Sequence, residues 1–279
     1  MMWNLGRAFG IGLVWCRIGG PSDSSPLWSF NPLPGPMRLL RPSMLLLPFA
    51  LGCAEVERSI EETVPADGID RLEASVERGS LTYAGISETT FLIEGTSIGR
   101  GGGEQGAERR EEGNEVTVEV ADATLHLDAT SEFKRARVDL DVSGPSVLDL
   151  DVYAERGSVH MEEVEGEHII TADRVTSRQL IGNCDLLARS GGMDVDIWPY
   201  LEGRVILEST AGDVVLRLPY SGQYDIEVIA DPAYEMYIED LGFHSDFFEP
   251  GYFAGVVGDG SIEVTVYVNG GSFQLLESL

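Results

Sequence analysis

The stretch "GDVVLRLPYSGQYDIEV" (residues 212–228) holds two short alternating runs joined by a turn that contains proline and glycine. Apolar residues occupy every second position, first Val214, Leu216 and Leu218 and then Tyr224, Ile226 and Val228. Alternation with a period of two is typical of a β-strand with one buried face and one face in water. We therefore expect the first three to point inward, while Asp213 and Arg217 face solvent.

The same alternation recurs along most of the chain after Ile69. It is present in "RLEASV" (71–76), "EVTVEV" (115–120), "RVDLDV" (137–142), "LDLDVYA" (148–154) and "SIEVTVYV" (261–268). No window has a convincing 3.6-residue period of the kind that an amphipathic helix shows. The sequence therefore predicts an all-β fold.

Glycines divide this region into units of about twenty residues. "VERGSLTYAG" (76–85) and "AERGSVHMEEVEG" (154–166) share the corner Glu-Arg-Gly-Ser, and Gly166, Gly182, Gly203 and Gly222 follow one another at intervals of 16, 21 and 19 residues. Such a unit cannot bury its apolar face alone, but stacked units can, which is the logic of a β-solenoid. Glycine suits the corners because they need backbone angles that a Cβ would obstruct.

The stretch 212–228, together with "VILEST" (205–210) before it, resembles the signature rung of the bacterial putative-adhesin family. The segments 135–161 and "GDGSIEVTVYVNGGSFQLLES" (258–278) are similar to the opening and closing rungs of that family. The resemblance covers roughly 69–279 and implies a single-domain β-solenoid, or β-helix, without catalytic residues. Residues 231–253 depart from it, because they are longer and more aromatic than a rung.

The segment 37–53 resembles a bacterial lipoprotein signal. Arg38 and Arg41 precede an apolar run at 44–51, and Gly52-Cys53 follows, a layout typical of a cleaved export signal. The resemblance implies a lipid on Cys53 and, because Ala54 is not aspartate, delivery to the outer membrane. Leu51 and Ala50 stand in reverse of the usual order, so an uncut anchor or a plain secretory signal stays open.

Three further segments are expected to lie outside the packed domain. Residues 1–36 are interpreted as an upstream start before the true one at Met37, or as disordered, with a membrane segment at 8–16 as the alternative. The acidic residues 54–68 are expected to form a tether. The segment 99–114, with six glycines and one alanine as its only apolar residue, is expected to be a flexible insertion.

The chain carries 47 acidic and 19 basic residues, for a net charge of −28. Such a polyanion repels nucleic acids and anionic polysaccharides unless its cations are clustered. The densest basic spots are Arg109-Arg110 and Lys134-Arg135 with Arg137, and no larger cluster is visible in the sequence. We therefore expect no nucleic-acid partner.

Few side chains suggest chemistry. His126, His160, His168 and His244 lack metal-ligand spacing and are interpreted as exposed strand positions. Cys184 is expected to be a buried structural thiol if Cys53 carries the lipid. The pairs Asp139/Asp141, Asp149/Asp151 and Asp194/Asp196 each lie on one strand face. A solvated face is the favoured interpretation, with weak calcium binding and glycosidase-type catalysis as alternatives. No cofactor is expected.

The segment 233–253 is unusually aromatic. It contains Tyr234, Tyr237, Phe243, Phe247, Phe248, Tyr252 and Phe253. It is either a recognition surface or a cover for an open flank or end of the stack. The cover is favoured, and it predicts that at least two of Phe243, Phe247 and Phe248 are buried.

These features together predict a secreted, lipid-anchored β-solenoid of the cell envelope. It would act as a non-catalytic structural or interaction module, attached to the membrane through its lipid and facing an envelope or extracellular partner. The alternatives are a carbohydrate-active β-helix enzyme and a calcium-dependent binding module.

Overall fold

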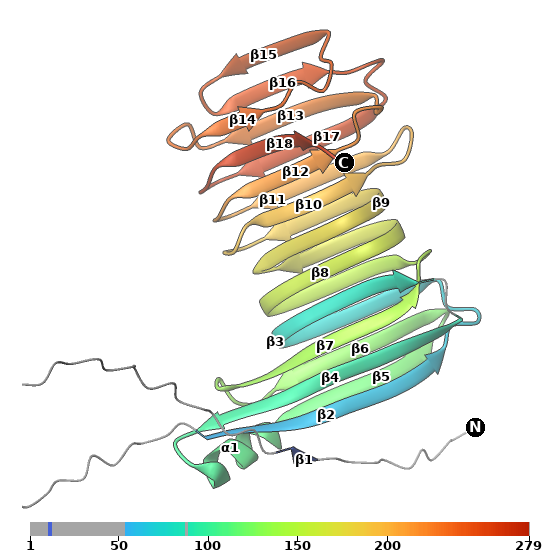
Figure 1. Ribbon diagram of the computed structural model, residues 1–279, viewed down its shortest axis with the longest axis vertical. Coiled ribbons are helices and arrows are strands. Elements are labelled where there is room, and N and C mark those ends of the chain that lie inside the picture. The colour runs from blue at the N-terminus through green and yellow to red at the C-terminus, as the bar shows by residue number, and fades with distance from the viewer. Residues whose placement is uncertain (1–10, 13–53, 87–88, 279) are drawn as a thin grey trace, which may run out of the picture.

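The structure is a computed structural model that describes residues 11–12, 54–86 and 89–278. This part of the chain is all-β, with one short helix, and its strands belong to one continuous sheet (Figure 1). The elements in chain order are β1 (Ile11–Gly12), β2 (Ala54–Pro65), β3 (Arg71–Ile86), β4 (Thr90–Gly101), α1 (Glu104–Glu111), β5 (Asn114–Ala121), β6 (Thr124–Ser131), β7 (Ala136–Pro145), β8 (Asp149–Ala172), β9 (Arg174–Ala188), β10 (Met193–Trp198), β11 (Arg204–Ser209), β12 (Val214–Leu218), β13 (Tyr224–Ala230), β14 (Met236–Ile238), β15 (Ser245–Glu249), β16 (Tyr252–Val256), β17 (Ile262–Val268) and β18 (Phe273–Glu277).

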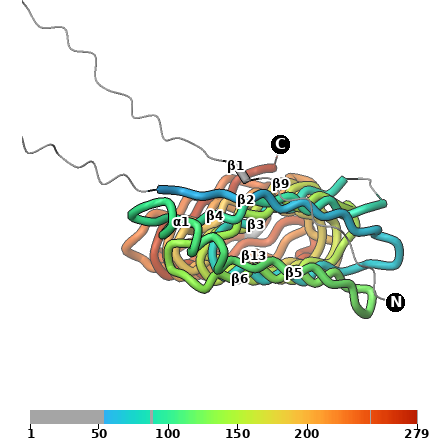
Figure 2. Tube along the Cα trace, turned by 90° about the horizontal axis from the view of Figure 1, so that it is seen from below, coloured from blue at the N-terminus to red at the C-terminus, as the bar shows by residue number. Residues whose placement is uncertain are grey.

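Parallel strands stack along the long axis of the molecule (Figure 1), and seen along that axis the layers lie over one another (Figure 2). Their pairings align one apolar residue from each layer into a ladder, which runs through Leu81, Val159, Val175, Met193, Val214 and Phe273. Each of these side chains is at most 3% exposed. The ladder forms because period-two alternation places the same face of every strand toward the interior. The expected register is confirmed, since Leu216 is buried while Asp213 is exposed and Arg217 partly so.

Two glycines in the Glu-Arg-Gly-Ser corners permit close approach between layers. Gly79 has a φ of +128°, and a Cβ there would lie 1.8 Å from the carbonyl oxygen of Val138. A Cβ on Gly157 would lie 1.6 Å from the carbonyl oxygen of Gly79. No side chain fits at either position, which confirms the expectation that these corners need glycine.

The order of the layers differs from the order of the sequence. β17 lies between β11 and β13, and β18 lies between β12 and β14. The C-terminal strands therefore fill the interior of the stack, and β13 to β16 form its end (Figure 1). The expectation that 258–278 closes the stack is wrong in this respect. Local alternation specifies a buried face but not which neighbour a strand receives.

The other end of the stack is closed by long strands that run antiparallel. β4 pairs with β2 on one side and β7 on the other, and β5 pairs with β6. The acidic segment 54–68 is thus mostly strand β2 rather than a tether. β2 lacks strict alternation, but β4 offers it twelve paired positions, and Ile60 and Val64 pack against the core.

Helix α1 replaces the flexible loop that we expected at 99–114. Ala107, the only apolar residue of that segment, is fully buried. The helix lies against β4 at Gly99 and Gly101, where a Cβ would come within 2.2 Å and 2.5 Å of the Ala107 backbone. Gly99 and Gly101 were among the glycines that suggested mobility. Because they have no side chains, the helix can pack closely against β4 there.

Candidate functional site

The aromatic segment 233–253 forms most of the end of the stack that is built from β13 to β16. We call this end the C-terminal end, because it lies opposite the end that holds β2. β16 pairs antiparallel with both β13 and β15, and β15 is the outermost strand at this end (Figure 1). The pairing places Phe248 opposite Phe253, which in turn lies opposite Val228. Phe248 therefore continues a row of core residues to the last strand of the stack.

The phenylalanines of this end differ sharply in exposure. Phe247 and Phe248 are each 55% exposed, whereas Phe253 is 2% exposed and Phe243 is half-buried against the core. The prediction that at least two of Phe243, Phe247 and Phe248 are buried is therefore wrong. Among the residues that the structure describes, no further layer covers β15, and its two phenylalanines are exposed.

The exposed rings rest on the buried ones. Phe243 packs against Phe253 in an edge-to-face arrangement, with ring centroids 5.3 Å apart, and Phe248 lies 6.3 Å from Phe253. On the other side of β15, Phe247 lies 6.0 Å from Tyr252. Aromatic pairs at these separations stabilise one another and fix the orientation of the rings. The exposed rings are thus held in place.

Carboxylates surround this aromatic surface. A pocket of about 600 Å³ is lined by Tyr237, Phe243, Phe248 and Phe253 together with Glu239, Asp240 and Asp246. The Tyr252 hydroxyl donates a hydrogen bond of 3.1 Å to Glu227, which raises the pKa of Tyr252. Tyr234 and Tyr237 are also half-exposed, at 50% and 56%. We call the rings of Tyr234, Tyr237, Phe243, Phe247, Phe248, Tyr252 and Phe253 the aromatic end. It offers apolar contact area within a negative field.

The aspartate pairs are engaged in local contacts, at separate places on the stack. Asp139 accepts hydrogen bonds from Ser80 and lies 3.0 Å from Arg137. Asp151 pairs with Arg71, and Asp149 accepts the backbone N–H of Glu167.

The remaining three aspartates lie on β7 and β10. Asp141 is exposed on β7, Asp194 pairs with Arg217, and Asp196 accepts a hydrogen bond from Ser278. In the register of the sheet, Asp139 and Asp141 lie opposite Ser80 and Thr82 of β3. Asp149 and Asp151 lie opposite Arg71 and Glu73, nearer the start of the same strand. In the part of the chain that the structure describes, no three His, Cys, Asp or Glu side chains are grouped as metal ligands.

One histidine lies in an unexpected place. His168 is 1% exposed, and its Nε2 lies 3.1 Å from the carbonyl oxygen of Ile181. Burial lowers the pKa of His168 from 6.5 to about 4. The interpretation of all four histidines as exposed is therefore wrong for His168. It stands in line with buried Cys184 on the next layer. Burial raises the pKa of the Cys184 thiol, and its expected burial is confirmed.

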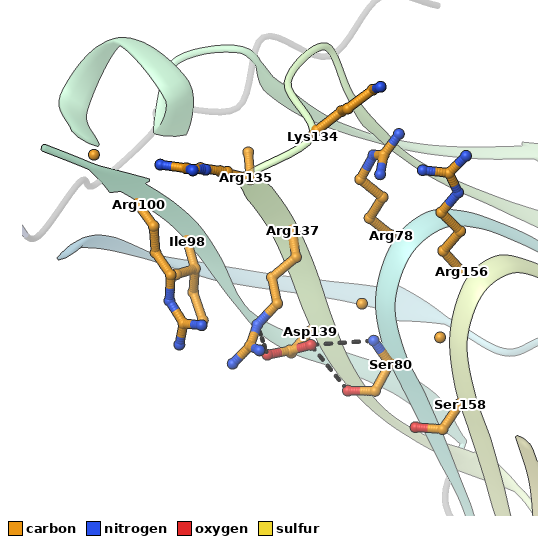
Figure 3. A pocket seen from close by; sticks show the side chains of 14 residues that line it. Arg78, Ser80, Ile98, Arg100, Lys134, Arg135, Arg137, Asp139, Arg156 and Ser158 are labelled. Atoms are coloured by element: carbon orange, nitrogen blue, oxygen red, sulfur yellow. Dashed lines mark hydrogen bonds and ion pairs between the residues drawn. The ribbon is translucent and has the colours of Figure 1, made fainter. Parts of the chain in front are cut away.

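The structure also gathers cations that are scattered in the sequence. These cations line a cleft of about 870 Å³, which we call the cationic cleft. Figure 3 shows the side chains that line it. Its basic residues are Arg78, Arg100, Lys134, Arg135, Arg137 and Arg156. They come from β3, β4, β8 and the region that leads into β7, so the expectation of no larger basic cluster is wrong. The sequence signal that could have revealed this cluster is the repeated Glu-Arg-Gly-Ser corner, because it supplies two of the six basic residues, Arg78 and Arg156.

The proposed lipidation residue Cys53 lies outside the described residues, as does the rest of 37–53. Within the described ranges, no helix is long and apolar enough to cross a membrane.

No protein-family model matches this chain, and no curated protein does. Among solved structures it is similar to a "putative cell adhesion protein" from Clostridium sporogenes, at 13% identity over 80% of this chain and 100% of that one, with a TM-score of 0.43. It is also similar to a "putative adhesin" from Bacteroides fragilis, at 11% identity over 78% and 97% of the two chains, with a TM-score of 0.24.

A third similar structure is a "putative lipid binding protein" from Parabacteroides distasonis. It has 10% identity over 79% of this chain and 96% of that one, with a TM-score of 0.25. At these identities and TM-scores, the similarities by themselves assign no function to this chain.

Proposed function

We propose that this chain is a non-catalytic, adhesin-like interaction module of the cell envelope, which binds a protein partner through the aromatic end. The observation that carries the proposal is the 55% exposure of both Phe247 and Phe248 on the outermost strand. The two rings lie on opposite faces of β15, Phe248 against Phe253 and Phe247 against Tyr252. Large exposed apolar side chains are typical of interaction sites, and aromatic rings contribute strongly to binding energy there.

The aromatic end favours a particular kind of partner. Glu239, Asp240 and Asp246 line its pocket, and the whole chain is strongly acidic. A protein surface with exposed arginine or lysine is complementary, because its cations can pair with the carboxylates and lie over the rings. We therefore infer a partner with a basic contact surface.

The scaffold supports this role. We interpret the stack as a β-solenoid, because successive strands pair in parallel at offsets close to the glycine intervals, with Val159 aligned to Val175 and Met193 to Val214. Such a stack is stiff and places its last strand far from its first. The three aspartate pairs lie at separate places on the stack, and five of their six carboxylates make local contacts, which speaks against the enzyme and calcium alternatives.

Lipid anchoring at Cys53 and delivery to the outer membrane complete the proposal. Anchoring at the N-terminal end would direct the aromatic end away from the membrane. Replacement by Cys53→Ser is expected to move the protein from the membrane fraction to the soluble fraction. Retention of the serine variant in the membrane fraction would contradict lipid anchoring at Cys53. That result would leave the proposed binding site untested and unchanged.

The binding site is tested by photo-crosslinking in living cells and then with purified proteins. A photoreactive phenylalanine analogue at position 247 should crosslink to a partner that mass spectrometry identifies, whereas the analogue at position 169 should not. Ile169 is a suitable control because it is 52% exposed on β8, away from the aromatic end.

The purified partner then gives the decisive measurement. The double variant Phe247→Ser/Phe248→Ser should weaken its binding by at least about tenfold, since loss of central aromatic contacts costs more than 1 kcal/mol. The Ile169→Ser variant should bind as the wild type does. Equal affinity of the double variant and the wild type would overturn the proposed site.

A further inference from the structure

We propose that the cationic cleft is a second binding site, specific for a compact soluble anion that carries two or more phosphate or sulfate groups. It lies near the opposite end of the stack from the aromatic end and does not depend on the function proposed above. Its residues come from β3, β4, β8 and the start of β7 (Figure 3).

The charge of the cationic cleft is opposite to that of the rest of the molecule. The chain has 47 acidic and 19 basic residues, yet the cleft is lined by six basic side chains and one acid, Asp139. That carboxylate lies 3.0 Å from Arg137 and accepts two hydrogen bonds of 3.1 Å from Ser80. Asp139 therefore offsets one of the six cations. Glu55, Glu77 and Glu155, next to the lining, offset part of the charge of Arg100, Arg78 and Arg156, so the cleft keeps a smaller positive charge.

The two Glu-Arg-Gly-Ser corners stack in register at one side of the cleft. β3 pairs with β8 so that Arg78 lies beside Arg156, Gly79 beside Gly157 and Ser80 beside Ser158. Neighbouring strands are about 4.8 Å apart, so the two arginines extend side by side, as Figure 3 shows. Like charges in such a position repel each other. An anion bound between them would remove that repulsion.

The acids next to these arginines make only long contacts with them. The Nε of Arg78 lies 3.5 Å from Glu77, and that of Arg156 lies 3.8 Å from Glu155, distances too long for good hydrogen bonds. The Nε of Arg78 is buried and has no hydrogen-bond partner. Guanidinium groups bind phosphate and sulfate through two parallel N–H donors, so a pair of them suits a ligand with two anionic groups.

The second side of the cleft adds cations from β4 and the entry to β7. The backbone N–H of Arg100 bonds to the carbonyl of Arg135, which holds the two segments together. Lys134, Arg135 and Arg137 are exposed. Arg100 pairs with Glu55 of β2 at 2.5 Å and so contributes mainly to the shape of this side. Opposed cationic walls favour a ligand with charges on more than one side.

The surroundings favour a compact ligand over a long one. The cleft measures about 870 Å³, which suits a small molecule. A long polyanion, or an anionic bilayer, would extend from the cleft onto a surface with a large excess of carboxylates and be repelled.

Isothermal titration of the full chain at low salt tests the site, with tripolyphosphate as the compact probe and inorganic phosphate as the comparison. We expect tripolyphosphate to bind at least about tenfold more tightly than phosphate, since it can engage both arginines. Arg78→Gln/Arg156→Gln should weaken tripolyphosphate binding by at least about tenfold. If that variant does not fold, Lys134→Gln, in an exposed turn, should still weaken it about threefold.

The matched control is Arg178→Gln. Arg178 is 75% exposed, pairs with Glu162 at 3.7 Å, and lies outside the cleft, so its loss should leave the affinity unchanged. Four results would overturn the proposal: no binding of tripolyphosphate by the wild type, unchanged binding by the folded cleft variants, tighter binding of heparin than of tripolyphosphate, or binding only to vesicles that contain phosphatidic acid.

Discussion

At the N-terminal end of the stack, buried polar side chains hold the closing strands together, whereas at the C-terminal end the closing strands present aromatic rings to water. The N-terminal network joins Ser97 to Glu111 at 2.8 Å, Asn114 to Ser97 at 2.9 Å and Ser131 to Asn114 at 2.6 Å. All four side chains are at most 7% exposed. This network connects β4, α1, β5 and β6, and Arg58 of β2 adds a contact of 2.7 Å to Glu111.

Both ends solve the same problem, because a stack of strands leaves open edges and an open core unless something covers them. The N-terminal solution uses buried polar groups that hydrogen-bond to one another and to the backbone of Ile98 and Arg137, which specifies one arrangement. The C-terminal solution is incomplete, since Phe253 is covered while Phe247 and Phe248 are not. On the function proposed above, one end serves structure and the other end serves binding.

The largest expected effect is at the buried part of the C-terminal end. Phe253→Ala should lower the free energy of unfolding by about 3 kcal/mol or more, because it removes a 2% exposed ring and leaves a cavity. Denaturant titration measures the change. A loss below about 1 kcal/mol would mean that Phe253 does not belong to the core and that none of the rings of the aromatic end stabilises the stack.

The stack between the two ends should be sensitive to acid through His168. In the folded protein its pKa is about 4, against an ordinary value of 6.5, so the unfolded chain binds the proton more readily. The contribution of the neutral, buried ring is therefore present above pH 6.5 and is lost as the pH falls toward 4. The total is on the order of 3 kcal/mol.

Unfolding of the wild type and of His168→Gln between pH 7 and pH 4 checks this expectation, since other groups titrate equally in both. The wild type should lose more stability than the variant. Parallel curves for the two proteins would contradict a buried neutral histidine.

At the N-terminal end, Asn114→Ala should lower the free energy of unfolding by about 2 kcal/mol, because it removes the buried side-chain acceptor of Ser131 and the donor to Ser97 and to the carbonyls of Ile98 and Arg137. Asn269→Ala, at an exposed turn, is the matched control and should have little effect. Chemical denaturation of both variants provides the measurement. A neutral Asn114→Ala would show that the polar network does not hold this end.

The smallest expected effect on stability is that of Phe247→Ala. Its ring is 55% exposed, so the free energy of unfolding should change by no more than about 0.5 kcal/mol. Partner binding should nevertheless weaken. A large loss of stability would mean that Phe247 covers the core, and the contrast between the two ends would then be wrong.

Much of the strand pattern could be predicted from the sequence, whereas most of the sites could not. Alternation is local, so Val214, Leu216 and Leu218 could be assigned to the interior without knowledge of their neighbours. The glycine corners were visible for the same reason. The aromatic end was recognised as a candidate, but its exposure depends on whether another layer lies beyond β15, which no local pattern reports.

What the sequence by itself determined is the all-β class, the inward face of each strand and the corners at Gly79 and Gly157, because these depend on backbone sterics and on the spacing of neighbouring residues. What only the tertiary structure decided is which strands lie side by side. That choice places β17 and β18 inside the stack, seats α1 on the glycines of β4, buries His168, and brings Arg78 beside Arg156, 78 residues apart in the chain. Pairing across such distances depends on the packing of the whole stack, so local sequence could not specify it.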